Sequence, residues 1–190
     1  MATYIREVFI HLIDDYFPFT TFVKSTGDGL LMTVHFDRTN VVEMVRKTAT
    51  ASLRAVDEFA AMTKGNPMIT FPTPPYLGVG LARGTTCCLV SDGRILDYSG
   101  HLLNLASRLM DLGRPSGVIM DGTFGYDLLD DDTQAQFEPA EVYIRGVAEN
   151  QSHPVYIQKD HVVLPDYALK PMNVAPLPSP EKRQASGQSG

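Results

Sequence analysis

The sequence contains few cysteines and no long apolar run, and each absence excludes a class of protein. Only two of its 190 residues are cysteines, Cys87 and Cys88, and sequence neighbours have poor geometry for an ordinary disulfide. This excludes a disulfide framework, and we expect both thiols to be reduced, buried residues of a cytoplasmic protein. No apolar run approaches the roughly 18 residues that indicate a membrane span, and the N-terminus lacks a signal-peptide profile. We therefore expect a soluble chain without a membrane partner.

Positive charge is also scarce, because the formal net charge is −6 at pH 7. This balance disfavours a nucleic-acid backbone as the main partner, although a local cluster of Lys and Arg can still bind a small anion. With 44% hydrophobic residues and 20% charged residues, the chain can bury a sizeable core as one globular domain. Its five histidines show no metal-ligand spacing, so we expect them to be structural or exposed: His11, His35, His101, His153 and His161.

The first third of the chain predicts a helix, a hairpin and a second helix. Apolar residues recur at helical spacing over residues 4–17, and Pro18 ends that helix. Residues 22–25 and 30–36 are typical of two strands joined by a tight turn over residues 26–29. Asn40 with Glu43 three residues later is a plausible capping pair for a long helix that ends before Gly65.

The rest of the chain alternates short strands and helices. The expected elements are strands over 76–83 and 85–90, a turn over 91–93, a turn carrying Asp97, Tyr98 and Gly100, a helix that follows it, a strand over 117–121, a short helix over 124–129, a solvated acidic loop over 130–132, and a hairpin from 140–147 and 154–158. The alternation follows no strict βαβ pattern, which predicts an α+β sandwich with a mostly antiparallel sheet. We expect the folded domain to span residues 1–164 and the Pro- and Ser-rich residues 165–190 to form a disordered tail.

Asn104 and Arg108 are one helical turn apart and therefore project from the same side of the helix that begins near residue 101. An amide and a guanidinium at this spacing can hold a phosphate or a ribose oxygen from a rigid platform. On spacing alone, two ordinary surface side chains remain the more common outcome.

Three segments together resemble one family. They are Lys-Ser-Thr-Gly-Asp-Gly-Leu-Leu over 24–31, Gly-Val-Gly-Leu-Ala-Arg-Gly over 78–84, and Asp-Tyr-Ser-Gly-His-Leu-Leu-Asn-Leu-Ala-Ser-Arg-Leu over 97–109. In order and approximate spacing they resemble the class III nucleotidyl cyclase catalytic domain, of the bacterial standalone type, over about residues 4–158. The resemblance implies a ferredoxin-like α/β sandwich that works as a homodimer, with active sites in the dimer interface.

The resemblance also implies roles for the base-binding and metal-binding residues. Asp28 matches one of two aspartates that hold a pair of Mg²⁺ or Mn²⁺ ions, and Asp is a suitable ligand for such hard cations. Lys24 and Asp97 match the two base-reading positions, and a Lys–Asp pair is similar to the adenine-type choice. The resemblance therefore implies ATP as the favoured substrate.

Three further residues match positions at the sugar and the phosphates. Asn104 matches the residue that orients the ribose, and Arg108 matches the one that stabilises the phosphate in the transition state. Arg145 falls where the family usually carries a triphosphate-binding lysine, and it would keep the charge while offering a planar fork. A fixed arginine adds positive charge where negative charge develops in phosphoryl transfer.

The resemblance breaks at the family's first strand, which carries the second metal aspartate. Residues 15–20, Asp-Tyr-Phe-Pro-Phe-Thr, resemble that strand superficially, but they lie only a few residues before Lys24, and residues 4–17 have the period of a helix. We therefore expect the fold to lack this strand and its aspartate, unless a longer natural protein supplies both.

The resulting prediction is an enzyme that converts a nucleoside triphosphate, with ATP favoured, to a 3′,5′-cyclic nucleotide and pyrophosphate for signalling. Within the same class, a pyrimidine nucleotide (UTP or CTP) cyclase of a phage-defence system remains open. A catalytically silent cyclase-like domain that binds a nucleotide or a partner and regulates it is the alternative from another class. A ferredoxin-like dimerisation domain without a ligand ranks last, because it leaves Asp28, Asn104 and Arg108 unexplained.

Overall fold

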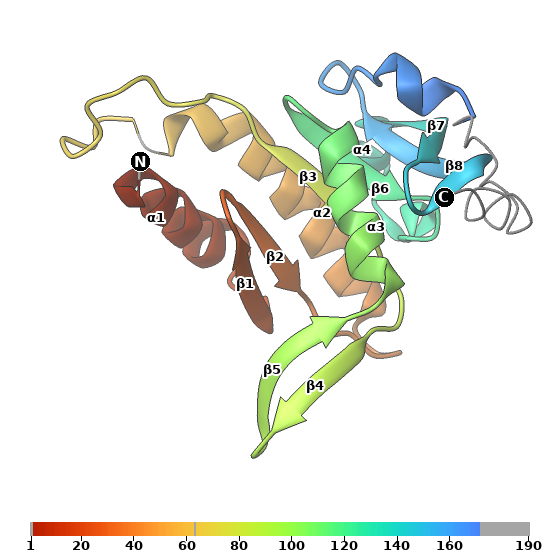
Figure 1. Cartoon of the computed structure of the whole chain (residues 1–190), viewed down its shortest axis with the longest axis horizontal. Helices are drawn as coiled ribbons and strands as arrows, with labels where there is room; N and C mark the ends of the chain where they lie inside the picture. The colour runs from red at the N-terminus through yellow and green to blue at the C-terminus, as the bar shows by residue number, and fades with distance from the viewer. Residues whose placement is uncertain (1, 63, 172–190) are drawn as a thin grey trace, which may run out of the picture.

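The computed structural model describes residues 2–62 and 64–171. Its strands are β1 (Phe22–Thr26), β2 (Gly29–Thr33), β3 (Gly78–Leu81), β4 (Cys87–Ser91), β5 (Arg94–Ser99), β6 (Gly117–Asp121), β7 (Phe137–Ile144) and β8 (Ala148–Gln158). Its helical segments are α1 (Ala2–His11), the π-helical η1 (Leu12–Tyr16), α2 (Val41–Glu58), α3 (His101–Leu112), α4 (Asp131–Ala135) and the short 3₁₀ turns η2 (Phe59–Ala61), η3 (Tyr126–Leu128) and η4 (Asp166–Leu169). Figure 1 shows their arrangement.

The central sheet has the strand order β3-β6-β8-β7. β3 runs parallel to β6, whereas β8 is antiparallel to both β6 and β7. All five residues of β6 are buried, as expected for an inner strand with helices on both faces. The mostly antiparallel α+β sheet predicted from the sequence is confirmed.

α2 and α3 cover opposite faces of this sheet. Ile119 packs with the apolar residues of α3, whereas its neighbours Val118 and Met120 pack with those of α2. Successive side chains of a strand point to opposite faces, so this alternation assigns one helix to each face. The helix predicted to follow Gly100 is confirmed as α3, with Leu105, Leu109 and Leu112 buried.

α3 lies close to β3 because two glycines of that strand face it. A Cβ at Gly80 would lie 2.1 Å from the Ala106 carbonyl oxygen and 2.5 Å from the Met110 nitrogen, both backbone atoms of α3. A Cβ at Gly78 would lie 3.1 Å from the Met110 carbonyl oxygen. Because these two residues have no side chain, α3 can pack close to β3. This close packing sets the position of α3 relative to the sheet, and so the positions of Asn104 and Arg108.

The N-terminal helix and hairpin form a separate layer with their own core. The helix predicted over residues 4–17 is confirmed as α1 continued by η1, and no strand precedes β1 in the described part of the chain. The predicted hairpin is confirmed as β1–β2, with Thr26 opposite Gly29 across a two-residue turn. Apolar residues of α1, η1, β2 and α2 pack together.

The turn predicted to carry Asp97 and Tyr98 is wrong, because residues 94–99 form β5 and pair with β4. The two strands make a hairpin, which we call the arm, that projects from the rest of the molecule (Figure 1). The expectation of buried cysteines is also wrong, because Cys87 and Cys88 lie on this arm and are exposed. Apolar character favoured burial, but β4 is exposed along its whole length.

Two predictions about helix starts need correction. Asn40 makes no side-chain capping bond to α2; instead Asp37 Oδ1 accepts hydrogen bonds from the backbone nitrogens of Thr39 and Asn40. The acidic run 130–132 is the start of α4 and not a loop, since the Asp130 carboxylate accepts from the Thr133 nitrogen at 2.9 Å. Asp is favoured at such positions because it satisfies a free backbone N–H.

Regular structure continues past residue 164, the boundary predicted for the folded domain. Residues 166–169 form η4, and Ala168 is fully buried in the core beneath α3. Most of the predicted tail, residues 172–190, lies outside the described residues. Within residues 2–62 and 64–171, none of the helices is long and apolar enough to span a bilayer.

Candidate functional site

Lys24 and Asp97, which are 73 positions apart in sequence, meet where β1 approaches β5. Lys24 Nζ donates to Asp97 Oδ2 at 2.5 Å, and the Tyr98 nitrogen donates to Asp97 Oδ1 at 2.8 Å. These hydrogen bonds, the one from Lys24 first, lower the pKa of Asp97. Both side chains remain partly exposed, at 47% and 35%. The structure therefore brings the two predicted base-reading residues together on a surface that a ligand can reach.

Tyr98 holds the two hairpins in this relation, and sequence reasoning missed it. Its ring is buried, lies 5.2 Å from the Phe22 ring in an edge-on contact, and lies 5.8 Å from the His35 ring. Its hydroxyl shares a short hydrogen bond with His35 Nε2, and burial raises the pKa of Tyr98. The available signal was the alternation of side chains along a strand. If the Asp97 side chain faces solvent, the next side chain, Tyr98, points to the opposite face, where an aromatic ring is expected to be buried.

Asn104 and Arg108 lie on the exposed side of α3, as predicted. Arg108 Nη1 is 3.7 Å from Asp111 Oδ2, a solvent-exposed ion pair one turn along the helix. The buried leucines on the other side of α3 and the glycines of β3 fix this platform. α3 therefore holds the Asn104 amide and the Arg108 guanidinium one turn apart on its exposed side.

Arg108 and Arg145 line the same cleft between α3, the end of β7 and η4. The cleft has a volume of about 460 Å³ and is lined by Arg108, Asp111, Leu112, Tyr143, Ile144, Arg145 and Tyr167. Leu112 and Ile144 are almost fully buried, so they form its floor, while the charged side chains are exposed. Two arginines and two tyrosine hydroxyls offer donors suited to a phosphorylated ligand.

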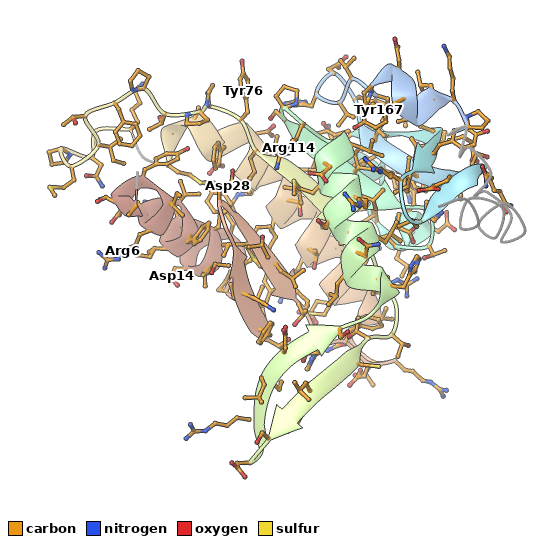
Figure 2. All side chains as sticks on the ribbon, viewed as in Figure 1. Arg6, Asp14, Asp28, Tyr76, Arg114 and Tyr167 are labelled. Atoms are coloured by element: carbon orange, nitrogen blue, oxygen red, sulfur yellow. The ribbon has the colours of Figure 1, made fainter. Side chains whose placement is uncertain are left out.

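Asp28 stands apart from this cleft. It lies in the turn of the β1–β2 hairpin beside Gly27, whose φ of +82° suits glycine. Figure 2 shows Asp28 at the hairpin tip, separated from Tyr167 at the cleft. Within the described residues no group of three or more His, Cys, Asp or Glu could hold a metal ion. Asp28 is therefore not part of a larger ligand cluster in the described part of the chain.

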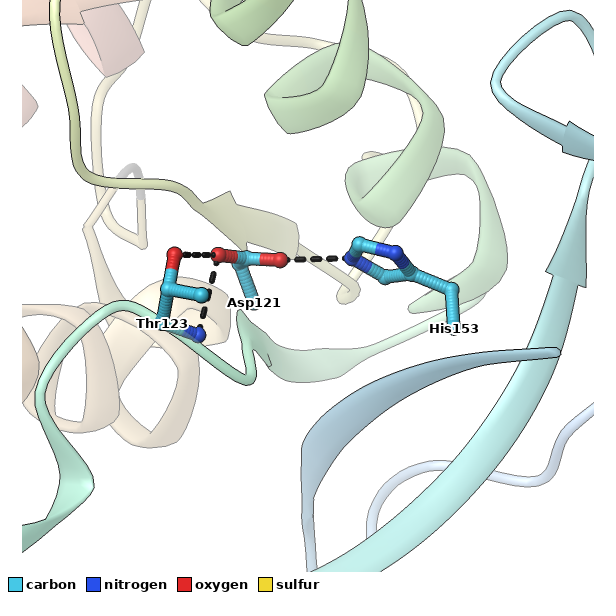
Figure 3. A network of polar contacts seen from close by, with 3 residues as sticks. All are labelled: Asp121, Thr123 and His153. Atoms are coloured by element: carbon cyan, nitrogen blue, oxygen red, sulfur yellow. Dashed lines mark hydrogen bonds and ion pairs between the residues drawn. The ribbon is translucent and has the colours of Figure 1, made fainter.

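Sequence reasoning also missed a buried carboxylate at the end of β6. Asp121 is 3% exposed, and its Oδ1 lies 2.6 Å from His153 Nε2 (Figure 3). Its Oδ2 accepts hydrogen bonds from the Thr123 nitrogen at 3.0 Å and from the Thr123 hydroxyl. All the contacts are internal, so this network fixes the β6–η3 turn and β8 and fits the expected structural role of His153. An Asp-Gly pair after a buried strand was the only local signal.

Comparisons with known proteins show similarity at the level of structure. No protein-family profile and no curated protein sequence matches the chain. Two solved structures of adenylate cyclases from Trypanosoma brucei, described in their monomeric state, are similar to it. One has a TM-score of 0.50 at 20% identity and covers 88% of this chain and 80% of its own; the other has a TM-score of 0.46 at 18% identity and covers 83% and 77%. The chain has a nucleotidyl cyclase-like fold. The first structure carries this conclusion, which concerns the fold alone.

Proposed function

We propose that this domain is a nucleotidyl cyclase that converts a nucleoside triphosphate, with ATP favoured, to a 3′,5′-cyclic nucleotide and pyrophosphate. The observation that carries the proposal is the meeting of Lys24 with Asp97 at 2.5 Å, at the base of the strand that leads into the Asn104–Arg108 helix. Lys24 and Asp97 come from separate strands, in a fold similar to that of an adenylate cyclase. A cytoplasmic location, where nucleoside triphosphates are abundant, belongs to the same proposal.

The base would be bound by the Lys24–Asp97 pair. The ammonium donates and the carboxylate accepts, which matches a base edge that presents one acceptor and one donor side by side. The edge of adenine has this arrangement, because N1 accepts and the N6 amino group donates. The low pKa of Asp97 keeps the carboxylate in its accepting form near neutral pH.

The sugar and phosphates would lie along α3 and the cleft. Asn104 would orient the ribose, so that its 3′-hydroxyl faces the α-phosphate for in-line attack. Arg108 would neutralise the charge that develops on that phosphate, and Arg145 would hold the triphosphate. Both guanidiniums line the same cleft, so one polyphosphate can reach both. Pyrophosphate would leave from this cleft.

The pair of Mg²⁺ or Mn²⁺ ions expected from the resemblance fits the described residues poorly. Asp28 is one exposed carboxylate, and it belongs to no group of three or more His, Cys, Asp or Glu among the described residues. A single carboxylate fits one cation that is otherwise held by substrate phosphates and water. We therefore assign Asp28 as one metal ligand and derive no catalytic step from a pair of ions.

A homodimer is part of the proposal for the same reason. Asp28 lies apart from the Arg108–Arg145 cleft of its own chain (Figure 2). A second copy could place its own β1–β2 turn at this cleft, so that each site combines the cleft of one protomer with Asp28 of the other. The fraction of complete sites would then rise with protein concentration, because each site needs two protomers.

A catalytically silent, nucleotide-binding cyclase-like domain is the second candidate. The poor fit of a metal pair to the surroundings of Asp28 favours it, since the base and phosphate contacts need no metal pair and would bind a nucleotide without turnover. A regulatory role would follow from such binding.

The decisive experiment measures product formation from ATP, GTP, CTP and UTP in the presence of Mn²⁺. We expect a cyclic nucleotide from ATP, and loss of product in Arg108→Ala. Arg6→Ala is the matched control, because Arg6 is an exposed arginine on α1, far from the cleft in Figure 2, and should leave turnover unchanged. Faster turnover of UTP or CTP would replace ATP with a pyrimidine substrate. Nucleotide binding without product would favour the silent domain.

A further inference from the structure

Asp111 is the acidic side chain among the residues that line the Arg108–Arg145 cleft. Its two oxygens face different arginines: Oδ2 lies 3.7 Å from Arg108 Nη1, and Oδ1 lies 3.6 Å from Arg114 Nε. Arg114 follows α3 and is not among the lining residues (Figure 2). Asp111 therefore neutralises part of the charge that Arg108 brings to the cleft.

The two ion pairs are weak enough to exchange. The side chains of Arg108, Asp111 and Arg114 are 44%, 41% and 59% exposed, and exposed pairs at such distances contribute little net free energy. A polyphosphate offers several negative oxygens and can engage a guanidinium through two parallel hydrogen bonds. Such a ligand should therefore displace Asp111 from Arg108. Asp111 would keep Arg114 as its partner, so its charge would not be left alone.

We propose that Asp111 is a built-in competitor for the polyphosphate of the substrate. It holds Arg108 in the free chain, gives it up when the ligand enters, and so sets how tightly the cleft binds a polyphosphate. Arg114 assists the exchange by retaining the released carboxylate. The inference rests on the proposed function only for the class of ligand.

The test measures binding of inorganic tripolyphosphate to the full chain by calorimetry, without divalent cations. We expect Asp111→Asn to bind about two- to fivefold more tightly than the wild type, the change that corresponds to loss of one exposed ion pair. Added salt should shrink this difference, because it screens exposed charges.

Asp92→Asn is the matched control. It removes the same charge at the turn of the arm, away from the cleft, and its φ of 50° is one that asparagine tolerates. A gain in affinity equal to that of Asp111→Asn would mean that only net charge matters, and would overturn the proposal. Weaker binding in Asp111→Asn would overturn it too, because Asp111 would then assist the ligand.

Arg114→Gln tests the second half of the proposal. It should weaken binding in the wild type, because Asp111 then has only Arg108 to pair with. The same substitution should cost less in the Asp111→Asn background. Equal costs in both backgrounds would show that Arg114 acts independently of Asp111, and would remove its assisting role.

The outcomes separate this inference from the proposed function. If Asp111→Asn binds tripolyphosphate more tightly but the chain turns over no nucleotide, the inference is supported and only the proposed enzymatic activity is contradicted. Turnover in a chain whose affinity is unaffected by Asp111 removes only the inference. Absence of tripolyphosphate binding in every variant overturns it as well.

Discussion

Gly80→Ala should displace α3, the helix that presents Asn104 and Arg108. The added methyl group would lie 2.1 Å from the Ala106 carbonyl oxygen and 2.5 Å from the Met110 nitrogen. Both obstacles are backbone atoms in the middle of α3, so no change of rotamer can relieve the contact. The strand or the whole helix has to move.

The size of the effect follows from the required movement. The contact must lengthen by about 0.9 Å to reach 3.0 Å, a distance below which Cβ contacts essentially do not occur. Overpacking of this kind typically costs about 1–3 kcal/mol. We expect a value near 3 kcal/mol, because the movement also loosens the buried Leu105 and Leu109 against the sheet. For a chain of this length the melting temperature should fall by about 6–12 °C.

Urea denaturation and thermal melting measure the loss, with Gly84→Ala as the control. At Gly84 the nearest atoms to an added Cβ are the Leu102 methyl carbons, at 3.5 and 3.6 Å, which is ordinary contact. The control should therefore change the free energy of unfolding by less than about 0.5 kcal/mol. Equal stability of the two variants would refute the close approach of α3 to β3. Weaker tripolyphosphate binding by folded Gly80→Ala alone would tie the helix position to the cleft.

Three further predictions concern titrating groups. Burial, and then its hydrogen bond to a glutamate of α2, raises the pKa of Tyr16 to about 12. Its contribution to the free energy of unfolding is therefore complete below pH 10 and lost as the pH rises towards 12, a loss that Tyr16→Phe should not show. Lys24→Met should raise the pKa of Asp97 towards its ordinary value, as measured by NMR titration; an unchanged pKa would argue against the ion pair. Asp121→Ala should lower the free energy of unfolding by about 2–3 kcal/mol, because His153 and Thr123 would lose their hydrogen bonds to a buried carboxylate. A change below about 0.5 kcal/mol in urea denaturation would contradict that role.

Local elements of the fold could be predicted because their signals are local. The leucine spacing over residues 102–112 predicts α3, and its buried face is the predicted one. The Thr-Gly-Asp-Gly run over residues 26–29 predicts the turn between β1 and β2, and the register confirms a turn there, with its first and last residues paired as strand ends. In both cases the residues that decide the structure lie within one turn or one strand of each other.

The arm shows where this reasoning fails. Cys87 and Cys88 are small apolar residues, and local pattern favours their burial. Whether a hairpin folds back on the core or projects from it depends on contacts at its base, and here these come from Tyr98, Phe22 and His35. These contacts join residues that are more than 60 positions apart in the sequence, so the spacing of residues within one element cannot predict them. The pairing of Lys24 with Asp97 depends on the same junction.

The order of the candidate residues along one continuous segment links base, sugar and phosphate. Asp97 lies in β5, Asn104 follows in the first half of α3, and Arg108 comes one turn later, about 6 Å along the helix axis. The positions proposed to bind base, ribose and phosphate therefore follow one another in the order in which a nucleotide presents these groups. A change in the tilt of α3 against β5 would move the sugar and phosphate contacts while leaving the base contact with Lys24 in place. We therefore expect Gly80→Ala to raise the KM for every nucleotide alike, whereas loss of Lys24 should alter the preference among bases.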